Sequence, residues 1–179
     1  LTPDVFVFID NSNVFHGAQV LPDASVDRSV RVSIKELIRW LELGRWVHTR
    51  VVAGSMRTEK IVQEWQKYDY KPLTTSHDRD AHVDELLHSQ IVRLVSTPGQ
   101  LPGSIVLVTG DSDTHGRSLV ECVVMALDAG WHVELCSWAK CLHTSYAQLA
   151  ASGRYAGRLL LRLLDEKRSR LTFAATPLP

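Results

Sequence analysis

The chain has 179 residues, with 20 lysine and arginine residues against 20 aspartate and glutamate residues, so its formal net charge is zero. This balance argues against strong non-specific nucleic-acid binding by bulk charge, although a local basic rim is compatible with it. Three cysteines do not form a disulfide framework, and no apolar run reaches the length of a membrane span. We therefore expect an intracellular protein, cytoplasmic or nuclear, that has no membrane partner.

Apolar runs and helical stripes alternate along the chain. A long connection over 14–32 follows the first strand, and Ser33 then caps a helix that Gly44 ends. The expected strands are 5–9, 46–53, 72–75, 105–108 and 131–138, and the further expected helices are 59–70, 83–95, 118–129 and 144–151. Segment 159–164 fits either a helix or an edge strand, and residues 172–179 are expected to be loosely ordered.

This alternation predicts an α/β fold in three layers, α/β/α, with a mainly parallel sheet. We expect one domain over residues 1–166 and a C-terminal tail over residues 167–179. A strand order of 3-2-1-4-5 would set the first and fourth strands side by side at the switch point of the sheet. Segment 159–164 could then add an extra edge strand.

Acidic residues directly follow two of the expected strands. The apolar run over 5–9 ends in Asp10, and the run over 105–108 leads through a Thr-Gly turn to Asp111 and Asp113. In open α/β sheets, sites form outside the carboxyl ends of the strands. If the two strands are neighbours, their acids converge there.

Four stretches, in this order along the chain, resemble the NYN domains of the PIN-like nuclease superfamily. They are FIDNSN at 8–13, VDELLHSQI at 83–91, VLVTGDSD at 106–113 and GWHVELCSW at 130–138. The resemblance spans nearly the whole chain and looks closest to eukaryotic NYN proteins with a VDE-L-H pattern in the second motif. The chain is more distantly similar to the Regnase-type and meiosis-arrest endoribonucleases. It implies the 3-2-1-4-5 sheet and a magnesium-dependent endoribonuclease activity.

By this resemblance, four acids match the catalytic acids of the family: Asp10, Asp84, Asp111 and Asp113. Four carboxylates in one cleft repel one another, and a hard divalent cation such as Mg²⁺ or Mn²⁺ relieves that repulsion. We expect Asp10 and Asp111 to hold the principal ion, which would supply a hydroxide-like nucleophile. Asp84 and Asp113 would act through water or through a second ion.

Substrate contacts are expected at the same edge of the sheet. The candidates are Asn13, Arg57, Arg79, Arg117 and Lys140. The four cations would form a rim that binds phosphate groups, although each one alone also fits a solvated surface charge. Asn13 matches the polar companion of Asp10, and an Asx-type turn explains it about as well. The expected partner is RNA, and the expected substrate is single-stranded RNA.

Two other functions compete with the nuclease. A phosphatase of the haloacid-dehalogenase type needs an aspartate nucleophile and a second aspartate two residues later. After Asp10 that position holds Ser12, so the phosphatase pattern does not match. A catalytically weak RNA-binding or protein-interaction module of the same fold stays open, and metal-dependent turnover separates it from a nuclease. Trp138 fits base stacking or, more simply, the core. A homodimer, or additional RNA-binding domains outside this chain, would be compatible with the resemblance.

Overall fold

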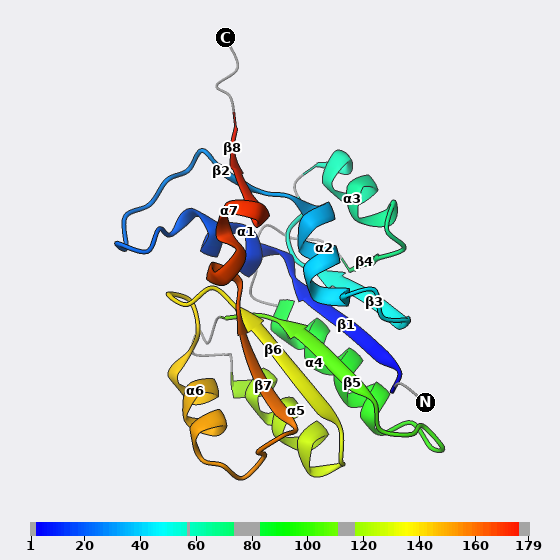
Figure 1. The fold of residues 1–179 in the computed structure, drawn as a ribbon. Coiled ribbons are helices and arrows are strands. Elements are labelled where there is room, and N and C mark those ends of the chain that lie inside the picture. The colour runs from blue at the N-terminus through cyan, green and yellow to red at the C-terminus, as the bar shows by residue number, and fades with distance from the viewer. Residues whose placement is uncertain (1–2, 57, 74–82, 111–116, 176–179) are drawn as a thin grey trace.

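The computed structural model describes residues 3–56, 58–73, 83–110 and 117–175 (Figure 1). Its centre is a six-stranded sheet in the order β4-β3-β1-β5-β6-β7, in which every neighbouring pair is parallel. The strands are β1 (Val5–Asp10), β3 (Val47–Ala53), β4 (Lys71–Leu73), β5 (Ser104–Val108), β6 (His132–Ser137) and β7 (Leu159–Leu163). This confirms the expected order, and the leucine-rich segment is the extra edge strand.

Helices cover both faces of the sheet, which gives the expected three layers (Figure 1). One layer contains α1 (Asn11–Gln19), α2 (Ile34–Glu42), α3 (Glu59–Gln66) and α7 (Arg168–Leu171). The other contains α4 (Val83–Val95), α5 (Arg117–Asp128) and α6 (Thr144–Ala151). None of the described helices combines the length and the apolar character that crossing a membrane requires.

Strand β1 lies between the two layers and is buried along its whole length. Val7 and Ile9 enter the core cluster below α1 and α2, whereas Phe6 and Phe8 enter the cluster below α4 and α5. Successive side chains of a strand point to opposite faces, so a strand covered on both sides needs apolar residues at every position. This explains why the first expected strand is an unbroken apolar run.

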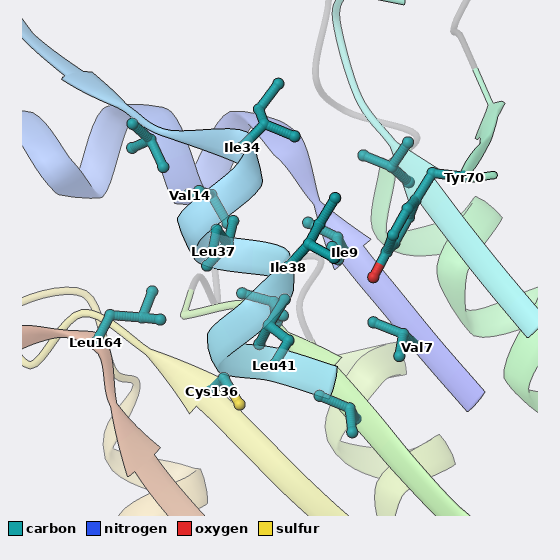
Figure 2. Packing of buried hydrophobic residues seen from close by; sticks show 14 of the residues in the cluster. Val7, Ile9, Val14, Ile34, Leu37, Ile38, Leu41, Tyr70, Cys136 and Leu164 are labelled. Atoms are coloured by element: carbon teal, nitrogen blue, oxygen red, sulfur yellow. The ribbon is translucent and has the colours of Figure 1, made fainter. Parts of the chain in front are cut away.

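Helix α2 covers the centre of the sheet (Figure 2). Its buried side chains, Leu37, Ile38 and Leu41 among them, recur at helical spacing and point toward the sheet. The hydroxyl of Ser33 accepts a hydrogen bond from the backbone N–H of Glu36 at 3.4 Å. The predicted cap of this helix is therefore confirmed.

The long connection expected over 14–32 is partly wrong, because α1 occupies Asn11–Gln19. The side chain of Asp10 caps this helix, so the polar motif after β1 begins a helix instead of a loop. Among the apolar side chains of α1, only Val14 and Ala18 are buried. A stripe this short, formed by small residues, gives little periodic signal in the sequence.

The C-terminal segment also differs from the loosely ordered one expected. Residues Thr172–Ala174 form β8, which pairs antiparallel with β2 (Val30–Val32) in a separate two-stranded sheet. A 3-10 turn, η2 (Leu164–Lys167), leads from β7 into α7. Leu164 and Leu171 are both fully buried in the cluster under α2, so the core extends into the segment that was expected to be a tail.

Candidate active site

The carboxyl ends of β1 and β5 lie side by side in the middle of the sheet, where Ile9 pairs with Val108. Strands β3 and β4 extend the sheet on the side of β1, and β6 and β7 extend it on the side of β5. Such a switch point is where open α/β sheets bind ligands. The chain leaves β1 at Asp10 and leaves β5 through Thr109 and Gly110.

Asp10 is the last residue of β1 and the N-cap of α1. Its side chain accepts a hydrogen bond from the backbone N–H of Asn13 at 2.9 Å, and the residue is only 5 % exposed. The positive end of the helix dipole favours a negative charge at this position. Strand and helix together therefore fix a carboxylate at the switch point, where the sequence predicted one.

Asp84 lies in the first turn of α4, at the same edge of the sheet. The preceding residue, Val83, is buried in the same cluster as Ala53, which pairs with Asp10 across the sheet. Burial raises the pKa of the Cys122 thiol in α5 to about 12, and the nearby negative charge of Asp84 adds to this rise. Asp84 therefore stands where the beginning of α4 meets both the sheet and α5.

Gly110 is the point at which three segments meet. A Cβ atom on this residue would overlap the hydroxyl of Ser137 and would lie 2.8 Å from the carbonyl oxygen of Cys141. The same atom would lie 3.0 Å from the amide oxygen of Asn13. The turn after β1, the end of β5 and the loop after β6 thus approach so closely that only glycine fits between them.

Replacing Gly110 with alanine is expected to lower the free energy of unfolding by about 1–3 kcal/mol, as overpacking of a dense interior does. The added methyl group meets a backbone carbonyl that cannot rotate away. Urea denaturation of the wild type and the variant measures this loss. Adding Ser137→Ala removes the hydroxyl contact and should restore only part of the stability. Equal stability of Gly110→Ala and the wild type would contradict the close packing.

Helix α1 is held by two buried tryptophans that contact its beginning and its middle. The indole N–H of Trp65 donates to the side-chain oxygen of Asn11 at 3.0 Å, so Asn11 has a structural partner. The indole N–H of Trp138 donates to the carbonyl of Val14 at 2.9 Å, and its ring fills the space that a Cβ on Gly17 would need. Trp138 is 1 % exposed, which confirms its place in the core.

Arg168 of α7 holds the other end of α1. Its guanidinium donates to the carbonyl oxygens of Ala18 at 2.9 Å and Val20 at 3.1 Å. It also forms an ion pair with Asp165 at 3.0 Å and lies 4.3 Å from the centre of the Trp138 ring. The C-terminal segment therefore fixes α1, the helix that Asp10 caps and that the sequence did not predict.

Asp165 extends this arrangement to the loop after β6. Its carboxylate accepts a hydrogen bond from the backbone N–H of Ala139 at 2.6 Å. The next residue, Lys140, is exposed at the carboxyl end of the sheet. Sequence reasoning missed Asp165 and Arg168, because no local motif marks either residue.

The structure describes only some of the residues predicted for the site. Asp10, Asn13, Asp84 and Lys140 lie at the carboxyl edge of the sheet, and Arg117 is the first residue of α5. The others, Arg57, Arg79, Asp111 and Asp113, lie outside the described residues. The convergence of the full acidic set and of the full rim therefore remains a prediction.

The donor chemistry of the described part fits a hard divalent cation. It offers the carboxylates of Asp10 and Asp84, and the hydroxyl of Thr109 is buried without a hydrogen-bond partner in that part. Mg²⁺ and Mn²⁺ prefer oxygen donors of this kind. Within the described ranges alone, no group of three or more His, Cys, Asp or Glu side chains could hold a metal ion.

Comparison with protein-family models and with curated proteins found no match for this chain. The sheet order alone does not select a class, because dinucleotide-binding sheets also follow 3-2-1-4-5-6. Those sheets bind pyrophosphate at a glycine-rich turn after the first strand, whereas here the turn after β1 reads DNSN. An acidic turn at this place disfavours binding of a bare phosphate and favours a cation.

Proposed function

We propose that the chain is a metal-dependent endoribonuclease that hydrolyses phosphodiester bonds in single-stranded RNA. The observation that supports this most is Asp10, fixed as a helix cap at the switch point, directly beside the strand that leads to Asp111. Asp84 begins α4 at the same edge of the sheet. The resemblance to NYN domains supplies the reaction type and the substrate class.

Each residue has a distinct part in the proposed site. Asp10 and Asp111 would hold a principal Mg²⁺ or Mn²⁺ ion, while Asp84 and Asp113 would bind water or a second ion. When bound, the ion supplies a hydroxide-like nucleophile and offsets charge on the phosphate. Asn13 lies beside Gly110 and can contact the substrate or orient Asp10.

The cations of the rim would bind the phosphates on either side of the reacting one. The exposure of Lys140 on the loop after β6 supports this role. Arg57, Arg79 and Arg117 would complete the rim. Contacts with phosphate groups set the position of the RNA on the protein and carry no base specificity.

Incubating the protein with a fluorescent single-stranded RNA tests the proposal. Parallel reactions contain Mg²⁺, Mn²⁺ or EDTA, a DNA of the same sequence, and the variant Asp111→Asn. We expect cleavage of the RNA only with metal, and its loss in the variant. RNA binding without cleavage in any metal would overturn the nuclease and favour a binding module of the same fold.

A further inference from the structure

Strands β2 and β8 form a small ribbon beside α1, apart from the main sheet (Figure 1). Arg31 lies directly opposite Phe173 in its antiparallel register. Residues that pair in this way project from the same face of a sheet. Both are exposed, Phe173 by 54 %, whereas the next residue of β2, Val32, is 5 % exposed. The ribbon therefore has a buried face and an outer face that presents an aromatic ring beside a guanidinium group.

The outer face belongs to a basic part of a chain whose formal net charge is zero. Segments 28–32 and 167–175 contain five cations and no carboxylate. Arg168 and Arg170 have acidic partners elsewhere, at 3.0 Å and 2.7 Å. The other three, Arg28, Arg31 and Lys167, form no ion pair within the described part of the chain.

The ribbon is joined to the candidate active site by α1. Helix α1 contacts β2, and Arg168 ties the segment before β8 to the last carbonyl groups of that helix. The helix has nine residues, which corresponds to about 14 Å at the rise of an α-helix. Asp10 lies at the N-terminal end of α1 and Arg168 holds its C-terminal end, so this one helix connects the candidate active site with the segment that leads into the ribbon.

We infer that the outer face of the β2–β8 ribbon binds a single-stranded stretch of the RNA whose backbone lies in the active site. The inference rests on the proposed function. Phe173 offers a flat apolar face on which a base stacks, and the cations beside it bind phosphate groups. A stacking ring beside basic side chains is typical of proteins that hold single strands without base specificity.

The test measures RNA affinity in EDTA by fluorescence anisotropy, so that no cleavage occurs. Phe173→Ala is expected to weaken binding of a single-stranded RNA at least about fivefold, the loss that follows removal of one stacking platform. Arg31→Gln is expected to lower the slope of log affinity against log salt by about 0.7, the value for one phosphate contact on a single strand. Thermal melting of both variants verifies that they remain folded.

Matched controls lie at the opposite edge of the sheet. Trp46 precedes β3 and is 79 % exposed, so Trp46→Ala removes an exposed aromatic ring far from the ribbon. Arg93 is exposed in the last turn of α4, so Arg93→Gln removes a comparable charge. Neither control should change RNA affinity.

The possible results separate this inference from the nuclease. If the wild type cleaves RNA but Phe173→Ala and Arg31→Gln bind as tightly as the controls, the ribbon inference is overturned and the nuclease stands. If the two variants lose affinity while no metal gives cleavage, the ribbon inference is supported and the nuclease fails. Absence of any RNA binding by the wild type would overturn both.

Discussion

Asp10→Asn is expected to reduce metal-dependent RNA cleavage by more than about 100-fold while the protein keeps its fold. Asparagine retains a side-chain oxygen that can accept the hydrogen bond from the backbone N–H of Asn13. It is also as good an N-cap as aspartate, so the start of α1 is preserved. The negative charge is lost, and with it the attraction for a divalent cation. Cleavage assays and urea denaturation of the same preparation measure the two effects separately.

Asp10→Ala is the informative companion variant. It removes both the charge and the cap, so it should lose cleavage and also about 1 kcal/mol of unfolding free energy. Asp128→Asn removes an exposed acid at the end of α5, and it should leave cleavage unchanged. Wild-type cleavage by Asp10→Asn would rule out a role for this carboxylate in catalysis. Loss of folding in the same variant would show that its role is structural.

Ending the chain after residue 166 is expected to cost about 5 kcal/mol or more of unfolding free energy. The shortened chain lacks Leu171, which is fully buried. It also lacks Arg168, whose guanidinium satisfies the backbone carbonyls of Ala18 in α1 and of Val20, the residue that follows the helix. A loss of this size equals much of the stability of a typical domain, so we expect no cooperative unfolding transition. Circular dichroism during thermal and urea denaturation provides the measurement.

Shorter changes distinguish the contributions to this loss. A chain ending at residue 175 keeps α7 and β8 and should melt close to the full chain. Leu171→Ala alone should cost about 2–5 kcal/mol, because it leaves a cavity in the core under α2. If the chain ending at 166 melts like the full chain, the contacts of Arg168 and Leu171 contribute little to stability.

Most of the main sheet could be predicted from the sequence because its signals are local. Unbroken apolar runs mark β1 and β5, and the cap at Ser33 marks the start of α2. Helix α1 could not be recognised in the same way, since its partners are tryptophans far along the chain, Trp65 and Trp138. The pairing of β2 with β8 likewise joins two strands of three residues from opposite ends of the chain.

The candidate site was likewise only partly predictable from the sequence. Asp10 was predicted because it ends the apolar run of the first strand, and Asp84 because it begins the predicted helix over 83–95, whose motif resembles one of the NYN domains. The packing of Ser137 against Gly110, and the hold of Arg168 on α1, depend on distant residues that no short motif reports. Sequence analysis therefore found the residues proposed to carry the chemistry and missed those that position them.

The hold of Arg168 on α1 has a consequence for how the protein is made. A ribosome delivers the first strand and helix long before the segment that satisfies the last carbonyls of that helix. At ordinary rates of synthesis the interval is on the order of ten seconds. During this time the nascent chain has Asp10 but lacks the element that completes the packing around α1. A prematurely terminated product should therefore lack the fully packed α1 that holds Asp10 at the switch point of the sheet.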